Sequence, residues 1–295
     1  MAPDTLLPYL RAQGQSPRKS LGQHYLTDRG ILDAIVAAAE LPPDAVVIEV
    51  GPGPGTLTAA LLPHVARLVA IELDDYLAPL LSAHFGDWPQ FHLLHADALT
   101  LTPSAALLHT GGIAPYSLVA NLPYYITSAL LRHYLESAPP PQRSVVTVQL
   151  DVAQRIVARP PQMSLLAVSV QAYTRPQIVR RLPPEAFTPP PKVHSAVLRL
   201  DPLEQPWIEP ERRQPFFAVV RAGFGQKRKM LRNSLAAGLK LPPQIVEQAL
   251  AAAGILPQLR AQELDLPQWL ALMEALSGDA RFASVSEQVA PPSAD

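Results

Sequence analysis

The stretch Ala45-Val46-Val47-Ile48-Glu49-Val50-Gly51-Pro52-Gly53-Pro54-Gly55 decides the fold of this chain. Its first six residues form a short apolar run, which predicts a buried β-strand. The alternating glycines and prolines that follow predict a sharp turn, because glycine permits backbone angles that other residues avoid. Residues 56–65 then carry leucines at helical spacing. The stretch therefore predicts a strand, a tight turn and a helix in immediate succession.

The same alternation continues along the chain. Apolar runs predict further strands over residues 67–73, 91–95, 116–120, 144–150, 177–182 and 194–200. Helical spacing predicts helices over residues 77–81, 127–136, 151–158 and 163–173. Continuous apolar strands that alternate with helices are typical of a parallel sheet covered on both faces. We therefore expect an α/β fold of the doubly wound, Rossmann-like kind.

The pattern changes to helices only from Trp207 onward, with predicted helices over residues 215–224, 226–239, 243–253 and 266–275. We expect a flexible N-terminal arm over 1–17, a sheet domain over 18–205 and a small all-α domain over 206–276. The small and polar residues 277–295 predict a disordered tail.

Composition excludes several classes of function. The chain has 295 residues and no cysteine, so disulfides, zinc–cysteine sites, iron–sulfur clusters and thiolate nucleophiles are excluded. Its histidines show no metal-ligand spacing, and we expect no metal. There is no signal-peptide pattern, and no apolar run reaches about 18 residues, so we expect a cytoplasmic protein without membrane contact.

Four predicted strands end in residues suited to ligand binding. The ends are Gly51, Glu72, Asp97 and Asn121. In a doubly wound sheet, ligands bind beyond the carboxyl ends of the strands, and an acid about 20 residues after the glycine turn can bind the hydroxyls of a ribose. Taken singly, these features are also consistent with a glycine–proline loop, a surface acid and a helix cap. Together they predict an adenosine-containing cofactor.

The glycine turn favours S-adenosylmethionine over NAD. A dinucleotide site needs G-x-G-x-x-G with free N–H groups for the pyrophosphate. Here the glycines lie at 51, 53 and 55, and Pro52 and Pro54 remove two donors. S-adenosylmethionine carries no phosphate and does not need them, so NAD is the alternative.

Asn121-Leu122-Pro123-Tyr124 can hold a flat ring that carries an amino group, although it is also consistent with an ordinary turn. The Asn121 side-chain oxygen and the backbone carbonyl of Leu122 or Pro123 can accept the two N–H bonds of an adenine amino group, and Tyr124 can stack on the base. No residue of this motif titrates near neutral pH. We expect catalysis by positioning and charge stabilisation, without a general base.

Five ordered motifs resemble one family. They are Arg18-Lys19-Ser20-Leu21-Gly22-Gln23-His24-Tyr25-Leu26, Glu49 to Thr58, Asn121 to Ile126, Phe187-Thr188-Pro189-Pro190-Pro191-Lys192-Val193 and Phe224-Gly225-Gln226-Lys227-Arg228-Lys229. The chain is similar over about 18–275 to the ribosomal RNA adenine dimethyltransferases, in particular the small-subunit KsgA (RsmA) family. The resemblance implies a class I S-adenosylmethionine-dependent methyltransferase sheet with a C-terminal RNA-binding domain.

The resemblance also assigns roles to residues. It implies that S-adenosylmethionine is bound by His24, Leu26, Gly51, Gly53, Gly55, Glu72, Asp97 and Asn121. It implies that Phe187 clamps the target base opposite Tyr124. The substrate it implies is 16S rRNA in the 30S subunit, where two adjacent adenosines of the 3′-terminal hairpin each receive two methyl groups on N6. We expect the protein to act as a monomer.

Two departures from the family pattern stand out. Position 24 is His where many relatives have Asn, so its cofactor contact would come from a ring nitrogen or the backbone. The strand ending Gln149-Leu150-Asp151 and the segment 159–164 also differ from the usual sequences, so an RNA contact there would differ.

A basic cluster predicts an RNA surface despite a net charge of −1. The cluster comprises Arg221, Lys227, Arg228, Lys229 and Arg232. Phosphate binding there would depend strongly on salt, although a solvated helix face is an alternative. Three functional alternatives also stay open: an NAD-dependent oxidoreductase, a 23S rRNA adenine methyltransferase of the erythromycin-resistance type, and a non-catalytic ribosome-assembly factor.

Overall fold

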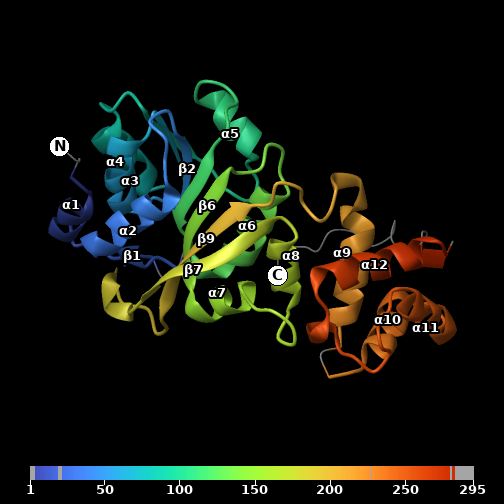
Figure 1. Cartoon of the computed structure of the whole chain (residues 1–295). Helices are drawn as coiled ribbons and strands as arrows, with labels where there is room; N and C mark the ends of the chain where they lie inside the picture. Colours follow the sequence, from blue (N-terminus) through green and yellow to red (C-terminus); the bar gives the residue numbers. More distant parts are fainter. Residues whose placement is uncertain (1–3, 19–21, 227, 280, 283–295) are drawn as a thin grey trace. The chain divides into compact units, whose positions relative to one another are not determined.

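The structure is a computed structural model that describes residues 4–18, 22–226, 228–279 and 281–282. Within that part, the chain divides into two compact units (Figure 1). Unit 1 comprises residues 1–153 and 175–202, and unit 2 comprises residues 154–174 and 203–295.

A sheet forms the centre of unit 1. In the described residues it has seven strands in the order β4-β3-β2-β5-β6-β9-β7. Strands β2, β6, β9 and β7 are labelled in Figure 1. Their bounds are β2 (Val46–Val50), β3 (Arg67–Glu72), β4 (Phe91–His95), β5 (Ser117–Asn121), β6 (Arg143–Gln149), β7 (Thr174–Leu182) and β9 (Ser195–Pro202). The strands from β4 to β6 pair in parallel, and β9 pairs antiparallel with β6. The expected α/β fold is confirmed.

Helices cover the sheet of unit 1. They are α1 (Leu7–Ala12), α2 (Arg29–Ala39), α3 (Thr56–Leu61), α4 (Leu77–Phe85), α5 (Pro103–His109), α6 (Thr127–Leu135) and the first turn of α7 (Leu150–Ile156), whose remainder belongs to unit 2. The side chain of Asp28 accepts a hydrogen bond from the Ile31 N–H and so begins α2, as its sequence predicted. The buried face of α2 packs against β5 and β6, and α4 packs against β4.

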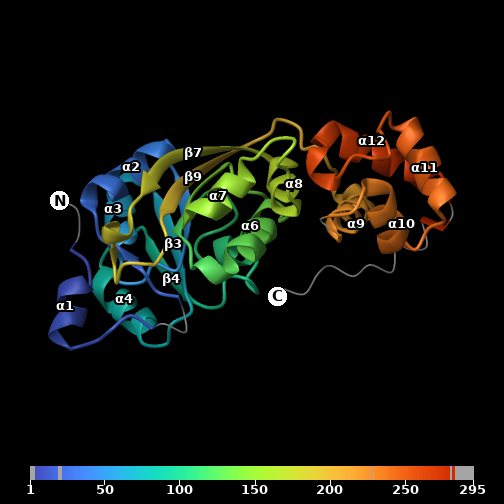
Figure 2. The same ribbon diagram turned by 90° about the horizontal axis from the view of Figure 1, so that it is seen from below.

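Unit 2 is helical, and Trp269 is among the aromatic side chains that it buries. Its helices are α8 (Leu165–Gln171), α9 (Arg213–Phe224), α10 (Leu231–Leu239), α11 (Pro243–Ala252) and α12 (Leu266–Ser277), of which the last four are seen together in Figure 2. Trp269 of α12 is fully buried beside Phe224 of α9. A Cβ atom on Gly223 would lie 2.4 Å from the Trp269 ring, so glycine is needed there for α9 and α12 to approach each other.

The expected boundary between the sheet domain and the helical domain was at residue 205, and the structure divides the chain differently. Residues 154–174, which include α8, belong to unit 2. The Trp207 N–H donates to the Ala172 carbonyl at 2.9 Å, and the Met163 N–H donates to the Gln262 carbonyl at 3.0 Å. These backbone hydrogen bonds connect residues 154–174 to the C-terminal part of unit 2.

Residues 4–18 are folded against unit 1, whereas we expected a flexible arm. Leu6 and Leu10 are each 5% exposed and belong to the apolar core of that unit. The Leu6 N–H also donates to the Pro54 carbonyl in the glycine–proline turn, at 2.9 Å. The arm therefore covers the turn that follows β2.

Two further expectations differ at helix ends. The helix expected over 226–239 begins at Leu231, because residue 230 is extended and the Lys229 N–H closes a turn on the Gln226 carbonyl. The first residues of the expected disordered tail are folded, since Ser277 ends α12 and Phe282 is buried. Residues 283–295 lie outside the described residues.

A small sheet that the sequence did not predict joins two distant segments of unit 1. Strand β1 (Tyr25–Leu26) pairs antiparallel with β8 (Phe187–Thr188), with Leu26 opposite Phe187. Residues 22–24, which directly precede β1, line the pocket at the carboxyl ends of the parallel strands.

Candidate active site

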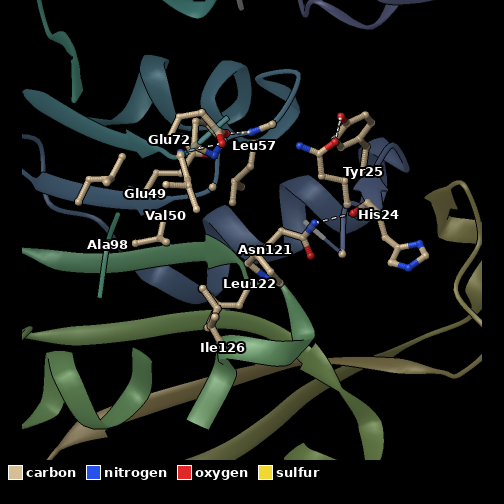
Figure 3. Close-up of a pocket in the computed structure, with 18 of the residues that line it drawn as sticks. His24, Tyr25, Glu49, Val50, Leu57, Glu72, Ala98, Asn121, Leu122 and Ile126 are labelled. Atoms are coloured by element: carbon tan, nitrogen blue, oxygen red, sulfur yellow. Dashed lines mark hydrogen bonds between the residues drawn. The ribbon is translucent and has the colours of Figure 1, made fainter. Parts of the chain in front are cut away.

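A pocket lies at the carboxyl ends of β2, β3, β4 and β5 (Figure 3). The expected site residues that line it are His24, Leu26, Gly51, Gly53, Glu72, Asp97, Asn121, Leu122, Pro123 and Tyr124. Among the described residues that line it, none is lysine or arginine. The pocket therefore suits a ligand that carries positive charge and hydroxyl groups better than one that carries phosphates.

The glycine turn brings the backbone against this pocket. Gly51 and Gly53 have φ angles of 66° and 57°, which L residues rarely adopt. The Gly53 N–H donates to Glu72 Oε2 at 3.1 Å. Gly55 has a different role, since it does not line the pocket in the described structure and a Cβ atom there would lie 2.4 Å from the Phe85 ring. It permits close packing against Phe85 of α4.

Glu72 is buried at the end of β3, and backbone donors hold its carboxylate. Its Oε1 accepts from the N–H groups of Leu73 and Asp74, both at 2.9 Å, in addition to the Gly53 bond on Oε2. Burial raises the pKa of Glu72, although these hydrogen bonds oppose the rise. A carboxylate offers about four lone-pair sites. One site is therefore left on Oε2 for a hydroxyl donor in the pocket.

Glu49 is a functional candidate to which the sequence reasoning gave no role. Its carboxyl group lies next to the pocket, is 1% exposed and accepts a hydrogen bond from Thr58 Oγ1 at 2.8 Å. Burial raises the pKa of Glu49 to about 8, and the nearby charge of Glu72 adds to the rise. The signal available in the sequence was a single acid within an otherwise apolar strand.

Asn121 ends β5 with its carboxamide in a fixed orientation (Figure 3). Its Nδ2 donates to the His24 backbone carbonyl at 2.9 Å. A carbonyl can only accept, so this contact identifies the amide nitrogen and leaves Oδ1 as the acceptor on the other side. No hydrogen-bond donor among the described residues reaches Asn121 Oδ1.

The two backbone carbonyls that follow Asn121 are not equivalent. The Pro123 carbonyl accepts from the Ile126 N–H and from Thr127 Oγ1, both at 3.3 Å. The ladder between β5 and β6 ends where the Leu122 N–H donates to the Thr147 carbonyl at 3.2 Å. No donor among the described residues reaches the Leu122 carbonyl. Leu122 therefore offers the better second acceptor beside Asn121.

Tyr124 is half-buried and held at its hydroxyl end. Its hydroxyl group and Ser195 Oγ are 2.6 Å apart, and Ser195 is fully buried at the start of β9. Burial raises the pKa of Tyr124, so its phenol stays neutral at physiological pH. The ring of His24 stacks beside it, with 5.8 Å between the ring centroids.

The segment before β1 is tied to the cofactor side of the pocket. Gln23 Nε2 donates to Asp74 Oδ2 at 3.0 Å, and Arg18 forms an ion pair with Asp74 at 3.0 Å. Asp74 is itself 2% exposed and lies two residues after Glu72. This acid was not predicted, because its partners are more than fifty residues away in the sequence.

Phe187 is not among the described residues that line the pocket. Its side chain is 2% exposed and belongs to the apolar core of unit 1, opposite Leu26 in the β1–β8 pair. The structure therefore does not bring Phe187 opposite Tyr124.

The basic cluster lies in unit 2 around the connection between α9 and α10. Arg221 is in the last turn of α9, and Arg228 and Lys229 are exposed in the connection. Arg232 is on α10, where its guanidinium forms an ion pair with Glu247. Lys227 lies outside the described residues.

Two classes of site are absent from the part of the chain that the structure describes. It contains no group of three or more His, Asp or Glu side chains arranged to hold a metal ion. No helix in it is long and apolar enough to cross a membrane.

Comparison with known protein families gives one match over nearly the whole chain. Residues 14–277 match the family described as Ribosomal RNA adenine dimethylase. A protein of Dehalococcoides mccartyi named Ribosomal RNA small subunit methyltransferase A is 44% identical over 262 residues, which cover 89% of each chain. A protein of Clostridium perfringens with the same name is 40% identical over 260 residues, covering 88% of this chain and 90% of the relative.

Solved structures show the same fold. The 23S rRNA methyltransferase ErmE is 30% identical, with a TM-score of 0.67 over 86% of this chain and 99% of its own. A dimethyladenosine transferase from Plasmodium falciparum is 23% identical, with a TM-score of 0.69 over 84% of this chain and 96% of its own.

Proposed function

Because the chain belongs to the ribosomal RNA adenine dimethylase family, we propose that it methylates N6 of two adjacent adenosines in the 3′-terminal hairpin of 16S rRNA. It is an S-adenosylmethionine-dependent enzyme of ribosomal RNA. The single structural observation that carries the proposal is the orientation of Asn121, which lines the pocket and whose Oδ1 is left to accept a hydrogen bond.

The residues around the pocket fit S-adenosylmethionine, which supplies an electrophilic methyl group on a sulfonium when bound. The remaining lone pair of Glu72 suits a ribose hydroxyl. Asp97 already accepts the Leu99 N–H on Oδ1 and has its second oxygen available for the adenine or its amino group. The lack of lysine and arginine in the described lining fits a cationic ligand without phosphate and disfavours NAD.

The target adenine would be oriented by acceptors at the end of β5. Asn121 Oδ1 and the Leu122 carbonyl accept the two N–H bonds of its amino group, which turns the nitrogen lone pair toward the cofactor. Tyr124 stacks on the base, which must leave its RNA stack to enter. The neutral Tyr124 phenol and the Asn121 amide cannot act as bases. These residues therefore accelerate the reaction by positioning and by stabilising developing positive charge.

The RNA substrate would be held in part by unit 2. The exposed Arg228 and Lys229, together with Arg221 and Lys227, supply positive charge for phosphates. Arg232 contributes less, because Glu247 already neutralises part of its charge. We propose that the 30S subunit is the natural substrate and that the protein acts as a monomer.

Modification of 23S rRNA is the second candidate, because ErmE shares 30% identity with this chain. The small-subunit relatives are more similar, at 44% and 40% identity, and favour the 30S assignment. A non-catalytic assembly factor is disfavoured because the acceptors of Asn121 and the carboxylates of Glu72 and Asp97 are all in place.

Labelled methyl transfer tests the assignment. The protein is incubated with labelled S-adenosylmethionine and separately with 30S and 50S subunits that lack N6-methylated adenosines. We expect label only in the 30S subunit, as N6,N6-dimethyladenosine at two adjacent positions near the 3′ end. Label confined to the 50S subunit would support the 23S alternative, and no label in either would contradict the enzyme assignment.

A further inference from the structure

The carboxamide of Gln23 is hydrogen-bonded at both of its ends. Its Oε1 accepts from the Arg18 N–H at 2.7 Å and from the Tyr25 hydroxyl at 2.8 Å. Its Nε2 donates to Asp74 Oδ2 at 3.0 Å. The backbone N–H of Arg18 can only donate and the carboxylate of Asp74 can only accept, so these contacts fix which end of the amide faces each partner. The side chain of Gln23 therefore has one orientation.

Asp74 connects Gln23 to the carboxylate at the end of β3. Its side chain is buried, and its Oδ1 accepts from the Tyr76 N–H at 2.9 Å and forms an ion pair with Arg18 at 3.0 Å. The backbone N–H of Asp74 donates to Glu72 Oε1 at 2.9 Å. A shift of Asp74 would therefore turn the carboxylate of Glu72, whose remaining lone pair suits the cofactor ribose.

Gln23 also lies directly before the backbone that orients Asn121. The next carbonyl along the chain, that of His24, accepts from Asn121 Nδ2 at 2.9 Å (Figure 3). The hydrogen bonds of the Gln23 side chain hold this stretch of chain in place. A change in them would displace the His24 carbonyl, and with it the direction of Asn121 Oδ1.

We propose that Gln23 and Asp74 form a positioning pair, which aligns the cofactor side of the pocket at Glu72 with the substrate acceptor at Asn121. This role rests on the proposed function, because it concerns the same site. Both ends of the Gln23 carboxamide are occupied, and Asp74 does not line the described pocket. The two side chains therefore act through their neighbours and not on the reacting atoms.

The pair can be reversed without a change of shape or net charge. Gln23→Glu alone places a second carboxylate at the 3.0 Å contact with Asp74, where like charges repel. Asp74→Asn alone removes the acceptor of the Gln23 amide and the ion pair with Arg18. In the double variant, the amide at position 74 donates to the carboxylate at position 23, which still accepts from the Tyr25 hydroxyl. The same two positions are then joined by a hydrogen bond in the opposite direction.

Cofactor affinity and methyl transfer test the pair in the full chain. Binding of S-adenosylhomocysteine is measured by calorimetry, and methylation of 30S subunits is measured at saturating S-adenosylmethionine. We expect Gln23→Glu and Asp74→Asn each to weaken binding and to lower turnover about tenfold, on the scale of one hydrogen bond to a charged group. The double variant should return to within about threefold of the parent in both measurements, whereas independent effects would multiply to about a hundredfold loss.

Gln90→Glu is the matched control, because it makes the same chemical change outside the pair. Gln90 Nε2 donates to the Leu62 carbonyl at 3.2 Å, and Gln90 does not line the described pocket. Its affinity and turnover should stay within about threefold of the parent. Circular dichroism verifies that each variant is folded. If Gln23→Glu does not fold, Gln23→Met retains the volume without the amide; it should weaken binding, and adding Asp74→Asn should not restore it.

Two results would overturn the inference. One is a parent-like affinity for S-adenosylhomocysteine in both single variants. The other is a double variant as weak as the product of the two single losses, which would mean that the two side chains do not act through each other. Failure of the proposed function reads differently, because the parent would then bind S-adenosylhomocysteine without methylating the 30S subunit. The affinities would still decide on the pair in that case.

Discussion

Asn121 uses one carboxamide for two purposes, since Nδ2 anchors the side chain to the His24 carbonyl and Oδ1 is left for the substrate. Replacing it with alanine removes both the acceptor and the anchor. We expect Asn121→Ala to lower turnover at least about a hundredfold, on the scale of losing one well-placed transition-state contact. Single-turnover methylation of 30S subunits measures this directly.

Cofactor affinity is measured in parallel by calorimetry with S-adenosylhomocysteine, because the family resemblance also assigns Asn121 to the cofactor site. Turnover of Asn121→Ala is measured at saturating cofactor, so that weaker cofactor binding does not account for its loss. If the variant kept turnover within a few-fold of the parent, the proposed role of Asn121 would be wrong.

Glu49 makes stability depend on pH through its buried carboxyl group. Its pKa is about 8 in the folded protein and about 4.5 when exposed, so the folded state holds a proton that the unfolded state has lost between these values. The free energy of unfolding of the parent, compared with that of Glu49→Gln, is therefore greatest below about pH 4.5. The difference declines as pH rises to about 8. The decline is at most about 1.4 kcal/mol per pH unit.

Thermal unfolding of the cofactor-free protein between pH 6 and 8 tests this. The unfolding temperature of Glu49→Gln should rise relative to the parent as pH increases. Glu40→Gln is the control with a pKa shift in the opposite direction, because a hydrogen bond from Arg199 lowers the pKa of Glu40. The difference in unfolding temperature between Glu40→Gln and the parent should stay constant between pH 6 and 8. Parallel curves for Glu49→Gln and the parent would contradict the assignment.

The connection between α9 and α10 is the element that concentrates exposed positive charge in unit 2. We expect the triple change of Lys227, Arg228 and Lys229 to alanine to weaken 30S binding and to reduce its salt dependence, because fewer counterions are released. The loss should be about tenfold or more at physiological salt. Filter binding at several salt concentrations measures both the affinity and the slope.

Arg212→Ala is a suitable control for the triple variant. Arg212 is a partly exposed cation of the same unit, but it is paired with Glu274 at 2.8 Å. Its removal should leave the affinity and the salt slope nearly unchanged. An unchanged affinity of the triple variant would assign the RNA surface to other residues.

The elements that sequence predicts well are those with a local signal. The strands that end at Glu72 and Asn121 are continuous apolar runs, and a parallel sheet brings such ends to one edge. The β1–β8 pair has only two residues in each strand, and it pairs Leu26 with Phe187, which are 161 positions apart (187 − 26). Local periodicity contains no information on that pairing, so the burial of Phe187 could not be predicted.

At the scale of the whole chain, the same limit explains the domain boundary. The change to helices at Trp207 is a local signal, and it suggested a boundary at residue 205. Helix α8 lies far earlier in the sequence but packs on α9 in unit 2. Only contacts between distant segments reveal that residues 154–174 belong there.

This division predicts how fragments of the chain behave. A fragment of residues 206–282 lacks the Ala172 carbonyl that accepts the Trp207 N–H, the Met163 bond to Gln262, and the packing of α8. We expect it to be less stable, by at least about 2 kcal/mol, than a fragment in which residues 154–174 are joined by a flexible linker to residues 203–282. Urea unfolding followed by circular dichroism compares the two fragments. Equal midpoints with equal slopes would mean that α8 adds nothing to the stability of unit 2, and the boundary near residue 205 would then describe the folding unit better.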